Sequence, residues 1–471
     1  MKNLPKIELP VDVCAEGFPV DPDFPQLKVA SDPQLMLEVF RRHLRPVSGR
    51  LCQIQECRPF RFRCRQSSSR CVLQYTLRVL EPGAGRQWDQ WVTGLVFARP
   101  GEAQRLCQEM QAADPLREIP QDWLAFEPVD FIPELQMLVQ VFPYDRKLPN
   151  LRRVMGGGLG SLEPLLLARL GPGPWHIEQR AIEPMRYRTE MGAALKYTVK
   201  ASETLKARSQ TRRCYLKVYR DHHGEETFQL LRSLAQKTSA GQQPFSVVNP
   251  VAYLSELRTL VLEEAAGASL QEILLQDGDP SSVLRAVARA VAAFNLHEVG
   301  VTRHHSIEDQ FADVKRASSL VQWACPEARA EVKALTASVV AGLGPVPPAP
   351  IHRDLKTEHI FLSDDRVIFI DLDSVALGDP VRDPAHLYAH MVGRVGLDSM
   401  SRDQARTAAS EFVEEYFCRV PKSWRERFPL HCAGALIEVA GGIFKRQEPL
   451  WFDKVTGALE QAQQALSGGF L

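Results

Sequence analysis

The pattern of apolar and polar positions divides the chain into a strand-containing first half and a helix-rich remainder. Apolar and polar residues alternate over 195–201 and 214–220, which is typical of half-buried strands, whereas 225–236 has helical spacing. From about residue 280 helical spacing dominates, beginning with 282–299, and only a hairpin pattern near 360–371 interrupts it. We therefore predict an α+β first half followed by a mostly helical C-terminal part.

Short motifs recur in the first half at a nearly constant separation. In unchanged order, 36–44 resembles 162–170, 58–63 resembles 183–188, 72–79 resembles 194–201, and 134–139 resembles 256–261. The separations stay between 122 and 126 residues, and repetition at a fixed period indicates a duplicated unit. We expect each copy to form a small α+β lobe, with the glycine-rich segment 155–164 as the joint between them.

The composition is that of an ordinary globular protein. The 57 basic and 57 acidic side chains cancel, and 45% of the 471 residues are hydrophobic. Zero net charge argues against bulk attraction to nucleic acid or to a membrane, and no apolar run reaches the roughly 18 residues of a spanning helix. We expect a cytoplasmic protein with reduced thiols, in which Cys52, Cys57, Cys64 and Cys71 are buried side chains and not a metal site.

The segment 350–387 concentrates the polar residues with chemical potential. Apolar runs at 360–362 and 367–370 predict a β-hairpin, and Asp364 and Asp365 are turn formers by position. A short hairpin of this kind brings the residues at its two ends close together.

The expected register of this hairpin brings three polar side chains together. Pairing of Leu362 with Val367 places His359 beside Asp371, and Asp354 lies just before them in the same loop. Phosphoryl transfer needs one carboxylate to orient the attacking hydroxyl and others to hold Mg²⁺ against the nucleotide phosphates. The sequence therefore predicts a phosphoryl-transfer site around Asp354, His359 and Asp371.

The loop before the hairpin also matches a known motif. His352, Arg353 and Asp354 resemble the catalytic HxD motif of the aminoglycoside phosphotransferase-like family, small-molecule kinases of the protein-kinase-like superfamily. The resemblance covers roughly 175–471. It implies that Asp354 is the catalytic base and that Lys356 touches the transferred phosphate.

The same resemblance implies the metal and its ligands. Asp371 is the implied carboxylate ligand of Mg²⁺, and His359 takes the place that is usually held by a metal-binding Asn. A metal held chiefly by Asp371 and Asp373 is one alternative that follows from this histidine. Because Mg²⁺ prefers oxygen ligands, Mn²⁺ is the alternative metal. We expect His359→Asn to preserve or raise activity.

The nucleotide site is implied further upstream. Lys217, on an alternating strand, resembles the lysine that anchors the ATP phosphates. Its expected ion-pair partner is Glu226, or the neighbouring Glu225, at the start of the next helix. The segment around Glu263, Glu264 and Ala265 resembles the hinge between two lobes and is expected to receive the adenine. No GxGxxG loop covers the phosphates.

The resemblance implies an α+β, bilobal protein-kinase-like fold with a small β-rich N-lobe and a helical C-lobe. The repeat adds a degenerate copy of the N-lobe, in which Leu95 aligns with Lys217, so this copy cannot act as a kinase alone. We expect it to be a cap, a specificity element, or a surface for a protein partner or self-association. The expected segments are an N-terminal extension (1–32), the degenerate repeat (33–157), the N-lobe (158–266) and the C-lobe (267–471).

The first copy contains an arginine-rich stretch. Residues 41–70 hold nine arginines and one acid, Glu56. These arginines form either an anion site or a solvated strand face with the side chains packed along it.

The acceptor is expected to be a small molecule with a hydroxyl group. Asp383 follows Asp371 by only twelve positions, which leaves no room for the long activation segment of a protein kinase. We therefore predict ATP- and Mg²⁺-dependent phosphorylation of an aminoglycoside, sugar or amino alcohol. The alternatives are a nucleotide-binding pseudokinase that regulates a partner protein and, more weakly supported, an acyl or nucleotidyl transferase.

Overall fold

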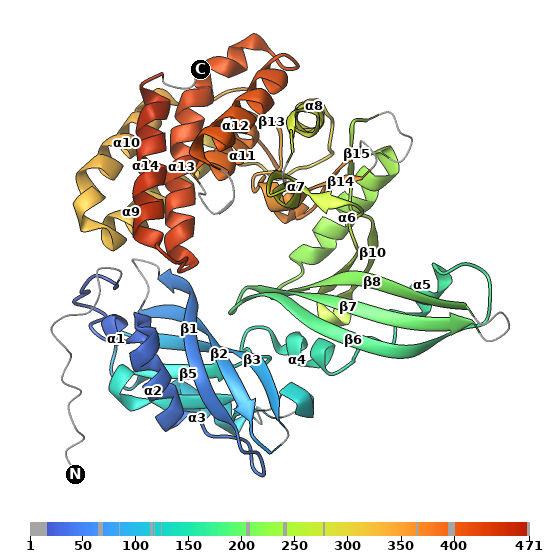
Figure 1. Cartoon of the computed structure of the whole chain (residues 1–471), viewed down its shortest axis with the longest axis vertical. Helices are drawn as coiled ribbons and strands as arrows, with labels where there is room; N and C mark the ends of the chain where they lie inside the picture. The colour runs from blue at the N-terminus through green and yellow to red at the C-terminus, as the bar shows by residue number, and fades with distance from the viewer. Residues whose placement is uncertain are drawn as a thin grey trace.

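The computed structural model has three parts, which Figure 1 shows as an N-terminal sheet at the lower left, a second sheet at the right, and a helical part at the top. The described residues are 17–64, 69–83, 85–113, 116, 118–123, 125–203, 208–238, 243–276, 278–363, 366–393 and 401–468.

The N-terminal sheet is antiparallel and has five strands. Asp32 begins its second helix by accepting hydrogen bonds from the main-chain amides of Gln34 and Leu35. In chain order the elements are α1 (Leu27–Ser31), α2 (Pro33–His43), β1 (Gln53–Cys64), β2 (Arg70–Glu81), β3 (Arg86–Phe97), α3 (Glu102–Ala112), β4 (Val129–Ile132) and β5 (Met137–Val141). The strands lie in the order β1-β2-β3-β5-β4.

The second sheet has the same number of strands, and two short helices precede it. In chain order its elements are α4 (Pro149–Met155), α5 (Glu163–Ala168), β6 (Trp175–Arg188), β7 (Gly192–Glu203), β8 (Arg208–Tyr219), α6 (His223–Thr238), β10 (Pro250–Leu254) and β11 (Thr259–Glu263). The strands lie in the order β10-β11-β8-β7-β6, which is the order of the N-terminal sheet read from its other edge.

The two sheets also correspond in register. Leu95 pairs with Val72 and Leu138, and Lys217, 122 positions later, pairs with Ala194 and Leu260. The residues that pair with Lys217 also lie 122 positions after the residues that pair with Leu95. A left-handed residue follows the 3₁₀ turn before the last strand of each sheet, at Gln136 (φ 44°) and at Arg258 (φ 46°). The central strands therefore present equivalent positions to their surroundings.

The helical part contains the third group of elements. Thirteen of the 18 residues of its helix Phe428–Lys445 are buried, which places this helix at the centre of the packing. The helices are α7 (Leu270–Leu274), α8 (Ser281–Leu296), α9 (Ile307–Ala324), α10 (Arg329–Gly342), α11 (Arg382–Val392), α12 (Arg402–Phe417), α13 (Phe428–Lys445) and α14 (Trp451–Leu466). Among the described residues, no helix combines the length and the apolar character needed to cross a membrane.

Short strands connect the second sheet to the helical part. The predicted hairpin pairs with β9 on one side and with β12 on the other. These strands are β9 (Phe245–Val247), β12 (Ala268–Ser269), β14 (Ile360–Ser363) and β15 (Arg366–Phe369), and β13 (Ala349–Ile351) pairs separately with β16 (Ala376–Gly378). The predicted turn residues Asp364 and Asp365 lie outside the described residues.

Candidate active site

The hairpin of β14 and β15 forms in the predicted register. β14 and β15 are antiparallel with Leu362 opposite Val367, and the main-chain amide of Ile370 donates to the carbonyl of His359 at 3.0 Å. Because the two strands end together, His359 and Asp371 lie side by side at the open end of the hairpin.

Three ligating side chains meet at this end. Ligand atoms of Asp354, His359 and Asp371 all lie within 4.8 Å of one another. The Nε2 atom of His359 is 3.3 Å from Oδ2 of Asp371. Within the part of the chain that the structure describes, this is the one group of at least three such side chains, so the cysteines of β1 and β2 form no comparable group.

The hydrogen bonding of His359 leaves one ring nitrogen able to bind a cation. Its Nδ1 atom lies 2.8 Å from the main-chain carbonyl of Asp354, which only accepts, so Nδ1 carries the ring proton. Burial, followed by the charge of Lys356, lowers the pKa of His359 to about 4, and the ring is neutral at pH 7. The lone pair of Nε2 therefore faces the negative Asp371, an arrangement that a divalent cation would stabilise.

Asp354 is a charged carboxylate beside a lysine. The Nζ atom of Lys356 lies 3.4 Å from Oδ2 of Asp354 and 3.4 Å from Oε1 of Glu358. Desolvation by the surrounding protein raises the pKa of Asp354, but Lys356 and His359 outweigh it and bring the pKa to about 2. The side chain is still 42% exposed, so its ionised oxygens can accept a hydrogen bond from a bound hydroxyl.

The loop that carries Asp354 is fixed by a buried carboxylate. Asp383 accepts hydrogen bonds from the main-chain amides of His352 at 2.7 Å and Arg353 at 2.9 Å, and from the side chain of Asn295 at 2.9 Å. Arg353 has φ 71°, a left-handed conformation that costs about 1 kcal/mol for such a residue. His352 Nε2 lies 2.9 Å from the carbonyl of Ile370 and so joins the loop to the hairpin. These bonds hold the strained loop in place.

Lys217 extends from β8 to the hairpin. It donates hydrogen bonds to Asp371 Oδ1 and, at 2.9 Å, to Asp373 Oδ2. Desolvation lowers the pKa of Lys217, but Asp373 and Asp371 outweigh this effect and hold the pKa above its ordinary value. Tyr219, two positions along the same strand face, donates to Asp373 Oδ1 at 2.7 Å. A charged lysine therefore joins the second sheet to the hairpin.

One expectation from the sequence needs correction. Glu226 does not pair with Lys217, because the ammonium group is occupied by the two aspartates; the Glu226 side chain is 75% exposed and pairs with Arg303 at 3.2 Å. Asp373 is bonded to Lys217 and Tyr219, and the group of three ligating side chains contains Asp354 beside His359 and Asp371. The role of Asp373 as a metal ligand stays a prediction.

The turn between β6 and β7 is held by the N-terminal sheet and the segment that follows it. Glu190 in this turn has φ 62° and is 4% exposed. Its carboxylate pairs with Arg70 at 2.5 Å, Arg146 at 3.6 Å and Arg63 at 3.7 Å, and its amide donates to Asp145 at 2.6 Å. A turn without the glycine-rich pattern is thus fixed by ion pairs.

Residues 201–425, a little under half of the chain, match the model of the phosphotransferase enzyme family, APH. This region carries Lys217, Asp354, His359 and Asp371 in the arrangement just described. Over this region the chain is similar to the phosphotransferase enzyme family.

Two solved structures resemble the chain at low sequence identity. The choline/ethanolamine kinase family protein from Mesorhizobium loti is 12% identical, with 66% of this chain and 92% of that chain covered and a TM-score of 0.41. Choline kinase from Cryptosporidium parvum Iowa II is 11% identical, with 62% and 91% covered and a TM-score of 0.42. No curated protein matches the chain.

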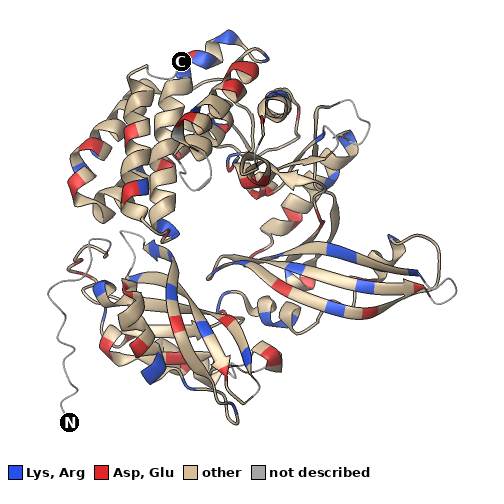
Figure 2. Cartoon of the chain, viewed as in Figure 1, with Lys and Arg blue, Asp and Glu red and all other residues tan. Residues whose placement is uncertain are grey.

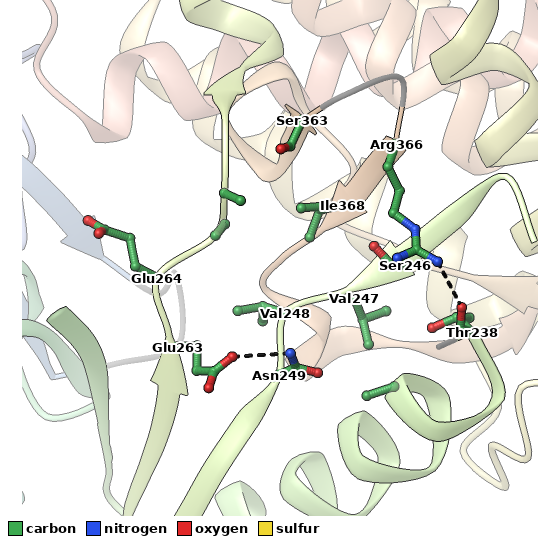
Figure 3. A pocket seen from close by; sticks show the side chains of 13 residues that line it. Thr238, Ser246, Val247, Val248, Asn249, Glu263, Glu264, Ser363, Arg366 and Ile368 are labelled. Carbon is green, nitrogen blue, oxygen red and sulfur yellow. Dashed lines mark hydrogen bonds between the residues drawn. The ribbon is translucent and has the colours of Figure 1, made fainter. Parts of the chain in front are cut away.

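A pocket of about 590 Å³ lies at the predicted hinge. Glu263, Glu264 and Ala265 line it, as Figure 3 shows for the two glutamates, and Val248 and Ile368 add apolar surface. Seven of its thirteen lining residues are polar or charged, and the apolar ones offer a surface for a flat ring. The sequence indicated the lining residues 263–265 of this pocket. It did not indicate the lining residues of the segment around β9.

Two further residues near the candidate site were missed from the sequence. Tyr219 could have been found, because alternation along β8 places it on the same face as Lys217. Arg188 could not, because its place on this face depends on the pairing of β6, β7 and β8.

Proposed function

We propose that the protein is an ATP- and Mg²⁺-dependent phosphotransferase that transfers the γ-phosphate to a hydroxyl group of a small molecule. One observation carries this proposal. Asp354, His359 and Asp371 meet at one point, and a charged lysine from another sheet is bonded to Asp371. This is the division of labour that phosphoryl transfer requires.

Each side chain has one task in this reaction. The hinge pocket receives the base and Lys217 binds the phosphates. Asp354 aligns the acceptor hydroxyl and takes its proton while the oxygen bonds to the γ-phosphorus and the bond to the ADP oxygen breaks. Lys356, beside Asp354, stabilises negative charge on the transferred group. A divalent cation held by Asp371 and His359 would neutralise charge on the phosphates when bound.

We also propose that the N-terminal sheet is a degenerate duplicate of the second sheet, with the chain divided at 33–157, 158–266 and 267–471. The equal strand order and the constant register shift support this duplication. With Leu95 in place of the lysine, the copy has no phosphate anchor. It acts as a cap that holds the β6–β7 turn.

The proposal is tested by ADP release. The purified protein is incubated with ATP, with Mg²⁺ or Mn²⁺, and with a panel of sugars, amino alcohols and aminoglycosides. At least one acceptor is expected to stimulate ADP release, and Asp354→Asn is expected to lower kcat about 10³-fold. The control is Asp122→Asn, at a side chain that is 85% exposed on the N-terminal part.

A nucleotide-binding scaffold would behave differently. Nucleotide would raise the Tm of the wild-type protein, but no acceptor or metal would give turnover that depends on Asp354. That combination would replace the phosphotransferase proposal.

A further inference from the structure

Three segments that are far apart in the sequence end at one place. At the end of β1, Phe62 packs against Phe444 of α13, with the ring centroids 5.7 Å apart. The neighbouring Arg63 donates to the carbonyl of Thr189, the residue after β6, at 3.2 Å. Figure 1 shows the end of β1 reaching the end of α13. The ends of β1, β6 and α13 therefore meet.

Each of these ends carries two basic residues. On β1 and β6 they flank the buried aromatic residues Phe62 and Tyr187, so strand alternation directs them away from the apolar face. Figure 2 shows basic segments at the end of β1 and at the facing end of α13. We call the group the basic cluster; it consists of Arg61, Arg63, Arg186, Arg188, Lys445 and Arg446.

The charges in the basic cluster repel one another. Burial, followed by the charges of Arg188 and Arg186, lowers the pKa of Arg61 to about 9. Desolvation also lowers the pKa of Lys445; Glu438 opposes this effect and Arg188 adds to it. A negatively charged ligand would relieve this repulsion.

Carboxylates of the protein balance only part of this charge. Glu190 pairs with Arg63 at 3.7 Å, and Glu448 pairs with Arg446 at 2.6 Å. Over the described ranges no ion pair is found for Arg61, Arg186, Arg188 or Lys445. The Nε atom of Arg61 is buried and has no hydrogen-bond partner in that same part of the chain, a costly state that an oxyanion would correct.

Arg188 connects the basic cluster to the catalytic carboxylates. Desolvation and then Arg186 lower the pKa of Arg188, while attraction by Asp354 and by Asp371 opposes them. Arg188 pairs with Gly192 of β7, which pairs with Tyr219 of β8, so Arg188 lies on the sheet face that carries Tyr219 and Lys217. Its side chain is nevertheless exposed to solvent, so a ligand can reach it.

We propose that the acceptor is an anionic hydroxylated compound, whose phosphate or carboxylate group binds the basic cluster while its hydroxyl faces Asp354. This inference rests on the proposed phosphotransferase function. Guanidinium groups bind oxyanions through paired hydrogen bonds, which would orient the acceptor. The N-terminal sheet thereby contributes Arg61 and Arg63 to substrate binding.

The position of the basic cluster favours the acceptor over the nucleotide. The proposed function assigns the nucleotide phosphates to Lys217, which is bonded to Asp371, and the base to the pocket at residues 263–266. Lys445 ends α13 in the helical part, which also carries Asp354, and Arg188 shares the sheet face of Tyr219 and Lys217. An anion on the cluster therefore lies on the side of the catalytic base.

Binding is tested first, without turnover. The wild-type protein, Arg61→Gln and Arg188→Gln are saturated with AMP-PNP and Mg²⁺ and titrated calorimetrically with inorganic phosphate and, separately, with acetate. We expect at least tenfold weaker binding of the preferred anion by both variants. Arg58→Gln is the matched control, because Arg58 lies on the same strand, is 54% exposed and pairs with Glu56. Tighter binding of phosphate would indicate a phosphate ester as the acceptor, and tighter binding of acetate would indicate a carboxylate.

Turnover is tested with acceptors that differ in charge: glucose, glucose 6-phosphate, gluconate, glucosamine, glycerol and glycerol 3-phosphate. An anionic acceptor is expected to react fastest, and Arg61→Gln is expected to raise its KM at least tenfold with kcat within threefold of wild type. Equal anion binding by all four proteins, preference for a neutral or cationic acceptor, or a loss of AMP-PNP affinity in Arg61→Gln would each overturn the inference. If nothing is phosphorylated, the proposed function fails, whereas weaker anion binding by the two variants still supports the site.

Discussion

The N-terminal sheet and the second sheet have the same strand order but opposite chemistry at one position. On β3, Leu95 is fully buried among Val72, Met110 and Leu138. On β8, the equivalent Lys217 is bonded to the aspartates of the hairpin. The strand pairing is the same in both sheets. The layer that covers the strand face decides whether the equivalent position belongs to the hydrophobic core or to the candidate site. The sheet is therefore a scaffold, and the chemistry depends on what the rest of the chain brings to it.

The largest effect is expected from giving β8 the residue of β3. Lys217→Leu removes the phosphate anchor and should lower kcat/KM for ATP about 10³-fold, a size typical for loss of a preorganised charge in phosphoryl transfer. ADP release, normalised to the folded fraction from circular dichroism, measures this loss.

The matched control for Lys217→Leu is Glu226→Gln. Glu226 is bonded to Arg303 and not to Lys217, so the activity of the Glu226→Gln variant should stay within about twofold of wild type. An equal loss in both variants would show that the lysine depends on Glu226 in the active enzyme, against the pairing described above.

The reverse exchange should affect stability. Leu95→Lys places an ammonium group in an apolar cluster at a position that is 0% exposed, and we expect it to lower the free energy of unfolding by about 3 kcal/mol. Chemical denaturation of this variant and of Leu95→Met measures the difference. A stable Leu95→Lys protein that binds a second nucleotide would mean that the two sheets are more alike than their surroundings indicate.

The next largest effect is expected from breaking the contact between the N-terminal part and the second sheet. Glu190→Gln removes the carboxylate shared by three arginines and should lower the free energy of unfolding by about 2 kcal/mol. Amide exchange in 186–192 should accelerate, because this turn loses its ion pairs. Unchanged exchange there would show that the N-terminal part does not hold the turn.

The smallest effect is expected from replacing His359 in the candidate site. His359→Asn supplies an amide oxygen, which Mg²⁺ prefers to imidazole nitrogen, so activity with Mg²⁺ should be preserved or raised within about threefold. The ratio of rates with Mg²⁺ and Mn²⁺ measures the change. A folded but inactive variant would contradict the assignment of His359 to the metal.

Local patterns predicted what depends on one short segment. The hairpin register followed from two apolar runs, and the direction of Lys217 followed from alternation along β8. The prediction that Glu226 pairs with Lys217 was wrong, because several carboxylates were available and only packing selects among them. The basic cluster was not predicted as a unit, because it combines residues from three distant segments. The sequence indicated only that the arginines of 41–70 form an anion site or a solvated face.

The central claim is that nucleotide binds to the second sheet and not to its N-terminal counterpart. Hydrogen–deuterium exchange with and without AMP-PNP and Mg²⁺ tests it directly. We expect slower exchange in 214–219, at the hinge 260–266 and in the hairpin, with no change in 92–97 and 137–141. Protection of 92–97 and 137–141 without protection of 214–219 would contradict the account.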